Sequence, residues 1–316
     1  MSDSMRRIID VSEENDAKLL KRLLETSKQH KAVLLTLIAP YVGRKVTPTK
    51  TLSASVGFSE EFAIETVIDE IKKRTDSKML MLLVNSPGGL VQSSYKVARA
   101  LRKAFNKIIV FVPHIAASGG TLIALTGNEI VMGMMSQFTP LDPHKENENG
   151  SETSAQAVVD AHSFVTSFFK DKEVSDAPYT YRVLADKFNP VDIRDALAEL
   201  SLMEEYICEI LESSGYKHDK CEKIAETLVR GFKTHGDVIN FDKAKKSGLH
   251  VVPESKYPNE WKLFREWLGK YMLQSADRHV IRFVVSEDLK RKEIKDKSTF
   301  ANKGQKKNEK RGEKNA

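Results

Sequence analysis

Continuous apolar runs and amphipathic stretches follow one another between residues 79 and 132. Residues 79–84 (MLMLLV) and 108–112 (IIVFV) are apolar runs of strand length, and residues 130–132 form a shorter one. A run without polar alternation is typical of a strand covered on both faces, as in a parallel sheet. Between the first two runs, residues 91–105 repeat apolar side chains at helical spacing. The pattern predicts βαβ units, and therefore an α/β fold with a mostly parallel sheet.

Further elements are predicted on both sides of this segment. An amphipathic helix is expected at residues 13–30 and a strand at residues 32–38, and Ser59 is expected to cap the next helix. A short helix at residues 121–125 completes the second βαβ unit. Later helices are predicted at residues 154–170, 190–213, 219–230, 241–247 and 259–272, and later strands at 249–252 and 279–285.

These elements predict three parts of the chain. An N-terminal helix occupies residues 1–31, a single domain occupies 32–286 with a helical insertion at about 151–230, and a basic tail occupies 287–316. The last sixteen residues hold six Lys/Arg, two Asp/Glu and no apolar side chain larger than alanine, so we expect them to be disordered. They contribute +4 of the net charge of +6. The remaining charge gives little reason to expect nucleic acid as a partner.

Composition indicates a soluble protein with neither a secretion signal nor a metal framework. The N-terminal residues lack the apolar stretch of about 7–15 residues that a signal peptide needs. Residues 108–128 carry no charge, but Pro113 and the Gly119–Gly120 pair interrupt them, which favours a buried strand and turn over a membrane span. The two cysteines form no Cys/His cluster. We therefore expect a cytoplasmic protein without cofactor or metal.

Two glycine-containing turns follow the first two buried strands. The first is residues 85–89 (NSPGG) and the second is residues 117–121 (ASGGT). The carboxyl ends of parallel strands meet at one edge of the sheet, which is where ligands bind in open α/β folds. A serine at a helix start beside glycine N–H groups supplies a nucleophile and oxyanion donors, the requirements of acyl transfer. Each turn alone is explained better by a structural role, with glycines making turns and Ser118 capping a helix.

Together, the motifs resemble a known family. NSPGGLV, ASGGTLIAL about thirty residues later, and then EIVM and SQFTPLDP are similar to the ClpP/crotonase superfamily. The similarity is greatest to the Clp-fold serine peptidases of the serine dehydrogenase proteinase family, relatives of signal peptide peptidase A. THGDVINFDKAKKSGLHVV resembles the closing motif of that family. The resemblance covers residues 32–252 and implies a ClpP/crotonase-like spiral of repeated β-β-α and βαβ units, plus C-terminal helices.

The resemblance also implies roles for individual residues. Ser118 would be the nucleophile, and the N–H groups of Gly88, Gly89 and Gly119 would form the oxyanion hole. The general base is left open among three histidines, in the order His144, His235 and His114. The candidate carboxylates that would orient the base are Asp142 and Asp237. If loop lengths differ from those of the family, the candidate lysine bases are Lys145 and Lys170.

The leading hypothesis for the function is a serine peptidase that cleaves peptides or unfolded proteins through an acyl-enzyme on Ser118. One alternative is hydratase or isomerase chemistry on acyl-CoA substrates, in which the same N–H groups polarise a thioester carbonyl. Another is a catalytically inactive scaffold of the same fold. Resemblance alone implies a homo-oligomer, and the sequence identifies neither an ATPase nor a membrane-protein partner.

The tail allows a first test. Truncation after residue 300 should leave folding intact, because sixteen residues without core-forming side chains bury little surface. We expect the melting temperature, measured by calorimetry, to change by less than about 2 °C. A fall of several degrees would show that the tail docks on the folded domain.

Overall fold

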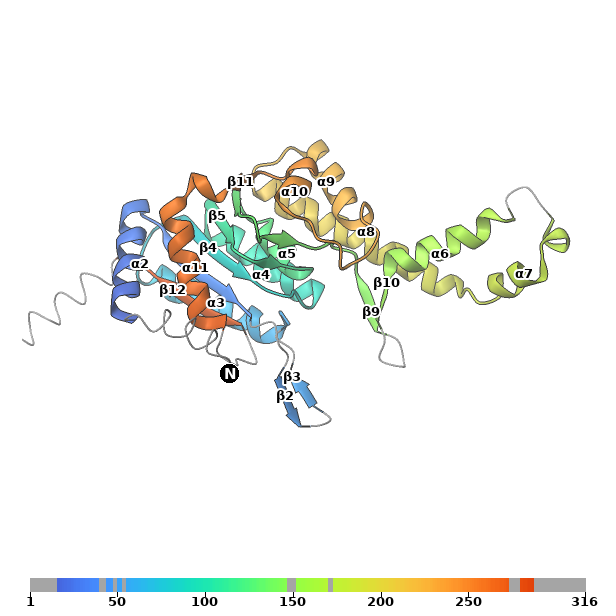
Figure 1. Cartoon of the computed structure of the whole chain (residues 1–316), viewed down its shortest axis with the longest axis horizontal. Helices are drawn as coiled ribbons and strands as arrows, with labels where there is room; N and C mark the ends of the chain where they lie inside the picture. Colours follow the sequence, from blue (N-terminus) through green and yellow to red (C-terminus); the bar gives the residue numbers. More distant parts are fainter. Residues whose placement is uncertain are drawn as a thin grey trace, which may run out of the picture.

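A six-stranded sheet lies at the centre of the protein (Figure 1). The computed structural model describes residues 16–39, 44–47, 50–52, 55–146, 152–169, 173–272 and 279–286, so the predicted tail at 287–316 lies outside them. All neighbouring strands are parallel except the last pair, in which β12 runs antiparallel to β1. Across the sheet the order is β11 (Val251–Pro253), β7 (Glu129–Met132), β5 (Lys107–Val112), β4 (Met79–Asn85), β1 (Val33–Ile38) and β12 (Val280–Val284).

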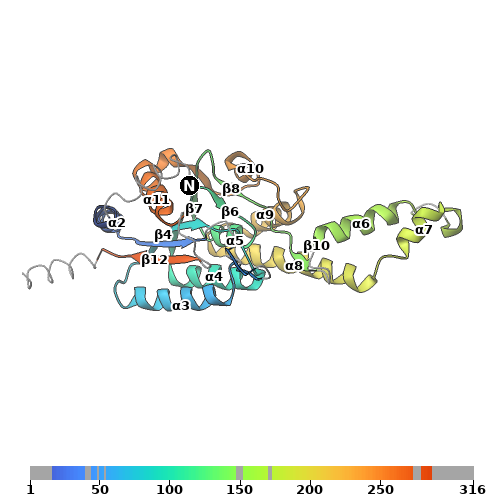
Figure 2. The same ribbon diagram turned by 60° about the horizontal axis from the view of Figure 1, so that its bottom comes forward.

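Both faces of the sheet are buried, which explains the continuous apolar runs. Leu80 and Leu82 of β4 face one core, and Met81 and Leu83 face the other. The first core lies under helices α3 (Phe58–Lys72) and α4 (Val91–Ala104), and the second lies under α2 (Asp16–His30) and α11 (Pro258–Met272) (Figure 2). Alternate residues of a strand point to opposite faces, so a strand between two cores has no polar face. The predicted α/β class is confirmed.

The start of α3 differs from the prediction. Ser59 was expected to be the N-cap, but α3 begins at Phe58 and its N-cap is Gly57. The carboxylate of Glu60, at the third position of the helix, accepts the N–H of the N-cap residue Gly57 at 2.9 Å, which is the return bond of a capping box. Ser59 lies inside the helix and donates to Glu60 Oε2 at 3.1 Å.

Short strand pairings cross the carboxyl ends of the main strands. Strand β6 (Ile115–Ala116) pairs in parallel with β8 (Gln137–Phe138). Isolated bridges extend this ribbon, joining Ser86 to Ala116, Phe138 to Ile239 and, beside them, Val56 to Gly89. The ribbon brings the two glycine turns side by side, and α5 (Gly119–Ala124) begins directly after it.

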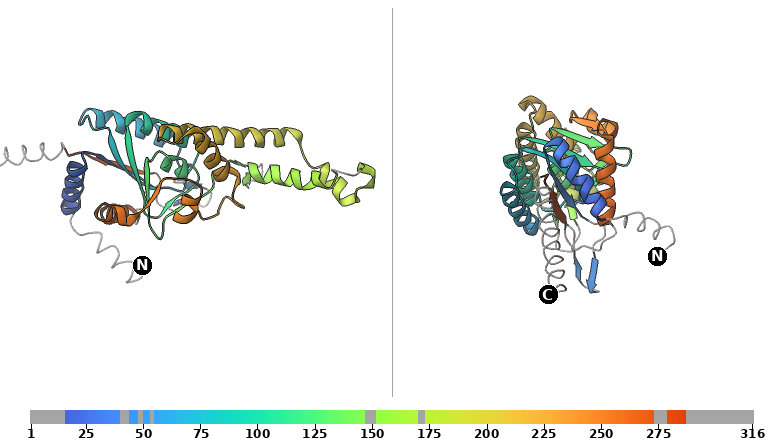
Figure 3. Two further views of the ribbon diagram at one scale, coloured as in Figure 1. Left: turned by 90° about the horizontal axis from the view of Figure 1, so that it is seen from above. Right: turned by 90° about the vertical axis from the view of Figure 1, so that its left-hand side faces the viewer.

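The helices after β8 form an arm and a cap over the first core (Figure 3). Helices α6 (Ala155–Ser167), α7 (Tyr179–Ala185) and the first part of α8 (Pro190–Ser213) project from the body. The second part of α8 packs on the body beside α9 (His218–Arg230), burying Leu200, Met203, Ile207 and Leu211. None of the helices in the described ranges has the length and apolar composition that a membrane crossing requires. The remaining elements are hairpins β2 (Arg44–Thr47)–β3 (Lys50–Leu52) and β9 (His144–Glu146)–β10 (Glu152–Ser154), helix α10 (Phe241–Lys246), and 3-10 turns at Val174–Asp176 and Glu254–Lys256.

The central strand provides a test of the two-core arrangement. Leu82 is fully buried in β4, so Leu82→Ala should lower the free energy of unfolding by about 2–5 kcal/mol through lost burial and a new cavity. The control Leu20→Ala changes a residue of α2 that is 37% exposed and should cost far less. Equal effects of the two substitutions in urea unfolding would contradict the assignment of Leu82 to the core.

Candidate active site

Ser118 lies in a strained turn between β6 and α5. Its backbone dihedral angles are φ 48° and ψ −123°, a region that residues with a side chain rarely adopt. The turn is held from both sides, because Ser118 N–H donates to Thr139 Oγ1 at 2.8 Å and Thr121 Oγ1 donates to the Ala116 carbonyl at 2.7 Å. Ser118 occupies the N-cap position of α5, but its side chain makes no capping hydrogen bond. A capping role therefore does not account for this serine, and its strained turn between a strand and a helix resembles the geometry that exposes a nucleophile in other hydrolases.

The first glycine turn packs directly against this serine. Gly88 has φ +95°, and a Cβ atom there would lie 2.6 Å from the Ala117 carbonyl oxygen and 2.8 Å from Gly119 N. Gly89 has φ +155°, and a Cβ atom there would collide with the backbone of Val56. The two turns can approach this closely only because neither glycine has a side chain.

The N–H groups of the three predicted glycines have different surroundings. Gly88 N–H donates to Ser86 Oγ at 3.1 Å, so it is engaged inside the protein. Within the described residues, the N–H groups of Gly89 and Gly119 have no hydrogen-bond partner. Their backbones are in contact, since a Cβ atom on Gly119 would lie 3.4 Å from Gly89 N. Two adjacent N–H donors beside a serine are suited to an oxyanion.

Two histidines share one buried carboxylate. His235 Nδ1 lies 2.6 Å from Asp142 Oδ1, and His144 Nε2 lies 3.5 Å from Asp142 Oδ2. The imidazole rings are tilted against each other, with their centroids 4.0 Å apart. The second nitrogen of His144, Nδ1, lies 3.4 Å from Glu152 Oε2 in β10. Asp142 itself is only 5% exposed.

The environment keeps this carboxylate ionised. Burial alone would raise the pKa of Asp142, but hydrogen bonds with His144, His235 and Ser154 outweigh burial and hold the pKa well below its ordinary range. The hydrogen bond to Asp142 raises the pKa of His144, against an opposing effect of burial, and Glu152 adds to the rise. His144 therefore holds its proton to a higher pH than an ordinary histidine.

Ser118 and the two histidines face one cavity of about 430 Å³. The TPLDPH segment supplies Asp142 and His144, and the long connection after α9 supplies His235. In the described part of the chain, neither imidazole is hydrogen-bonded to Ser118 Oγ, and such contacts often tighten only when substrate binds. The other lining residues are Ser55, Pro87, Gly89, Leu90, Val91, Gln92, Pro143, Glu152, Glu199, Leu202 and Met203.

The structure places the remaining predicted candidates elsewhere. Asp237 accepts hydrogen bonds from Lys233 N–H and Lys243 Nζ and is not among the residues that line this cavity. His114 is exposed beside β6 and does not line it either. Lys170 lies outside the described residues, as does the side chain of Lys145.

Sequence reasoning missed the residues that hold the nucleophile turn. Thr139 and Thr121 are buried threonines whose hydroxyl groups bond to the turn, and Thr121 Oγ1 also bonds to the backbone N–H and carbonyl of Thr139. Both threonines lie inside motifs that carry the family resemblance, SQFTPLDP and ASGGT. Their place in these motifs was the signal that the sequence offered.

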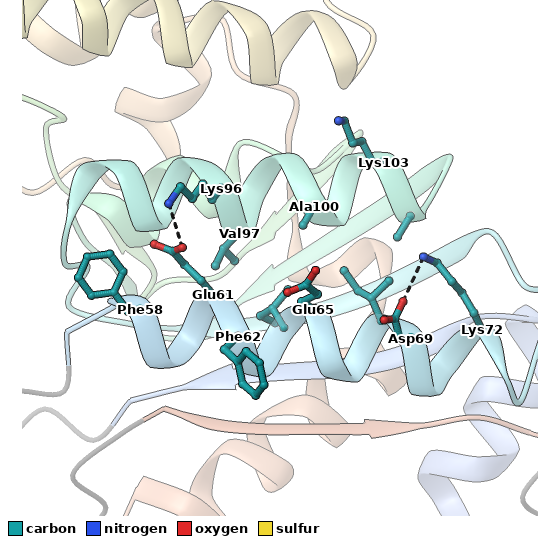
Figure 4. A pocket seen from close by; sticks show the side chains of 13 residues that line it. Phe58, Glu61, Phe62, Glu65, Asp69, Lys72, Lys96, Val97, Ala100 and Lys103 are labelled. Atoms are coloured by element: carbon teal, nitrogen blue, oxygen red, sulfur yellow. Dashed lines mark hydrogen bonds and ion pairs between the residues drawn. The ribbon is translucent and has the colours of Figure 1, made fainter.

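Another groove lies between α3 and α4 (Figure 4). It measures about 560 Å³ and is bordered by the ion pairs Lys96–Glu61 and Lys72–Asp69. No serine, cysteine or histidine is among its described lining residues. The smaller cavity at Ser118 is therefore the candidate active site.

The histidine pair also meets the spacing of a metal site. Asp142, His144 and His235 each offer one ligand atom, and these atoms lie within 4.8 Å of one another. Two imidazoles and one carboxylate are a donor set that zinc accepts. The cluster is thus able to serve either in acid–base chemistry or as a metal ligand set, although the sequence predicted no metal.

Comparison with known proteins identifies relatives over most of the chain. The family model described as ClpP-like SDH-type serine proteinase matches residues 60–298. The uncharacterized proteins MJ1495 and MJ0137 of Methanocaldococcus jannaschii are each 29% identical over 196 residues, which is 61% of this chain. The match spans 60% and 61% of the length of these two curated relatives. Among solved structures, a mutant of the 1510-N membrane-bound stomatin-specific protease aligns at 17% identity and a TM-score of 0.40, covering 63% of this chain and 74% of that one.

The shared carboxylate predicts a pH-dependent contribution to stability. The folded-state pKa of Asp142 is lowered, so its contribution is fully present above the unfolded pKa of about 3.9 and is lost as pH falls toward the folded pKa. Asp142→Asn should therefore lower the free energy of unfolding by about 2 kcal/mol near pH 6, and the difference from wild type should shrink below pH 4. The more exposed carboxylate variant Asp237→Asn is the control. A difference that does not depend on pH would contradict the ionised state of Asp142.

Proposed function

The chain belongs to the family of ClpP-like SDH-type serine proteinases, and on that premise we propose that it hydrolyses peptide bonds through an acyl-enzyme on Ser118. One observation carries the proposal. Ser118 has a strained backbone and a hydroxyl that caps no helix, and it lines a cavity together with Gly89 and an Asp–His pair. A strained backbone persists only where the surrounding structure holds it in place, and such residues cluster at active sites.

The oxyanion would be held by Gly89 N–H and Gly119 N–H. Both belong to the predicted set, whereas the third member, Gly88, has its N–H bonded to Ser86. Gly88 contributes instead by allowing the close approach of the two turns. Removal of one such donor is worth about 3–4 kcal/mol in the transition state.

We assign the general base to His235. Its Nδ1 faces Asp142 at 2.6 Å, which fixes the ring and leaves Nε2 as the nitrogen that accepts a proton. His144, placed first in the sequence-based order, has both nitrogens facing carboxylates and a raised pKa. A histidine that retains its proton is a poor base at neutral pH.

The reaction then proceeds in two steps. His235 Nε2 takes the Ser118 hydroxyl proton as Oγ attacks the peptide carbonyl carbon, and the same proton is delivered to the leaving amine as the C–N bond breaks. Water, deprotonated by His235, attacks the acyl carbon, and His235 returns that proton to Ser118 Oγ as the acyl C–O bond breaks and the carboxylic acid is released. A cavity of about 430 Å³ suits an extended peptide or unfolded segment, and not a folded domain, as substrate. The cytoplasmic location and the homo-oligomer stay predictions of the sequence.

Metal-assisted hydrolysis is a second candidate because Asp142, His144 and His235 lie at metal-ligand spacing. Dialysis against EDTA distinguishes the serine mechanism from metal-assisted hydrolysis. The serine mechanism keeps its activity after dialysis, whereas a metal-dependent one loses activity and regains it with added Zn²⁺.

The nucleophile is tested by labelling and substitution. A fluorophosphonate probe should label the wild type at Ser118, and Ser118→Ala should abolish labelling and lower peptidase activity by at least about 10³-fold. Ser55→Ala is the matched control, since Ser55 lines the same cavity and should still allow labelling. Unchanged hydrolysis in Ser118→Ala would assign the activity to another residue.

The base is tested by comparing the two histidines. His235→Gln should lower kcat by about 10³-fold or more, while His144→Gln should cost less than about 10-fold, because only His235 has a nitrogen available for the serine proton. Circular dichroism and thermal melting establish that both variants are folded. The reverse ranking of the two variants would return the role to His144.

A further inference from the structure

Beneath the first glycine turn, three buried polar side chains lie in a line. Ser86 Oγ lies 2.8 Å from His279 Nε2, and His279 Nδ1 lies 3.8 Å from Glu60 Oε1. The side chains of His279 and Glu60 are 0% and 4% exposed, and Ser86 is fully buried. The order serine–histidine–carboxylate is that of a catalytic triad, but no substrate reaches this serine. The group must therefore serve the neighbouring turn.

The first hydrogen bond of this group has a fixed direction. Gly88 N–H can only donate, so Ser86 Oγ accepts its proton at 3.1 Å. Ser86 Oγ and His279 Nε2 form the next hydrogen bond, at 2.8 Å. The other ring nitrogen of His279, Nδ1, has no hydrogen-bond partner among the described residues and faces the Glu60 carboxylate. Glu60 thus flanks the imidazole that orients the Ser86 hydroxyl, and that hydroxyl is the acceptor of Gly88 N–H.

Glu60 also reaches the other side of the same turn. Its Oε2 accepts Gly57 N–H at 2.9 Å, and the adjacent Val56 donates its N–H to the Gly88 carbonyl at 2.7 Å. Leu90 N–H returns a bond to the Val56 carbonyl at 2.9 Å. Burial would raise the pKa of Glu60, but the adjacent imidazole of His279 and the hydrogen bond from Gly57 outweigh burial and lower the pKa, so the carboxylate is ionised. Glu60 is therefore connected to Gly88 in two ways, through His279 and Ser86 on one side and through Gly57 and Val56 on the other. Together these contacts form a ring around the first glycine turn.

This ring determines where Gly89 N–H points. The peptide unit between Gly88 and Gly89 is planar and trans, so its N–H lies opposite its carbonyl. Val56 fixes the carbonyl end of that unit, and Ser86 fixes the preceding N–H of Gly88. Ser86 also bonds to the nucleophile strand, donating to the Ile115 carbonyl and accepting from Ala117 N–H. Ser86 therefore connects the oxyanion turn to the strand that precedes Ser118.

We propose that His279 is a positioning residue of the oxyanion hole, which acts through Ser86 and Glu60 to direct Gly89 N–H at the reacting carbonyl oxygen. The inference rests on the proposed peptidase function. His279 lies directly before β12, so the C-terminal strand brings to the site a residue 161 positions after the nucleophile.

The kinetic test compares substitutions along the line. His279→Leu and Ser86→Ala should each lower kcat about 10–100-fold with KM changed less than about threefold, because a misdirected donor weakens transition-state binding. His279→Gln, which retains a hydrogen-bonding group toward Ser86, should recover part of the loss. The double variant should be no worse than the more impaired single one, as expected for residues acting in one chain.

A matched control separates positioning from general stability. His30 Nε2 lies 2.8 Å from Glu260 Oε1 between α2 and α11, a second partly buried His–Glu pair on the opposite face of the sheet. His30→Leu should lower the melting temperature without changing kcat. If His279→Leu does not fold, Ser86→Ala and Glu60→Gln provide the same comparison.

A second measurement does not depend on catalysis. Hydrogen exchange of the Gly88 amide, followed in the Ser118→Ala background, should accelerate about tenfold or more on adding Ser86→Ala or His279→Leu, because its acceptor is lost or displaced. If the wild type has no peptidase activity but the Ser86→Ala and His279→Leu substitutions still accelerate exchange of the Gly88 amide, the positioning role is supported and only the peptidase proposal is overturned. Wild-type kcat in a folded His279→Leu variant, or multiplicative effects of the two substitutions on kcat, would overturn the positioning role.

Discussion

Two backbone turns approach each other so closely that no side chain fits between them. Gly88 and Gly119 are in contact beside Ser118, and Val56 closes the other side of Gly89. The parallel strands end at one edge of the sheet and deliver both turns there, while the ribbon of short pairings prevents them from separating. The strained φ of Ser118, the adjacent glycine N–H groups and the cavity shape all follow from this contact.

The strands of the main sheet could be predicted because each buried strand is a continuous apolar run within one short segment of the sequence. MLMLLV has no polar position, and the structure covers both of its faces with separate cores. The short pairings could not be predicted in the same way. Strands β6 and β8 have two residues each, too few for any periodicity, and their partners are defined only by the folded sheet. Ser59 is not the cap because α3 begins one residue earlier, at Phe58, with Gly57 as its N-cap.

In the candidate site, too, some features could be predicted from short segments of sequence and others are defined only by the fold. Ser118 and the glycines lie in contiguous motifs, so the sequence alone groups them as one candidate site. Asp142, His144 and His235 were named from the sequence. That both histidines contact the Asp142 carboxylate depends on how the segment after α9 returns to the cavity. His279 carries no motif at all. It is a single histidine before a strand, and only the antiparallel pairing of β12 with β1 places it beneath the oxyanion turn.

The position of β12 has a consequence for folding during synthesis. Strand β1 lies between β4 and β12, yet β12 is more than 240 residues further along the chain. Until the ribosome has released residue 284, β1 is an open sheet edge made of apolar residues, the kind of edge that pairs with other chains. Such long-range pairing also slows folding. The nascent chain can thus complete the sheet as far as β11 with the turn at Ser118 formed, while His279, the partner of Ser86 beneath the first glycine turn, is still to be synthesised.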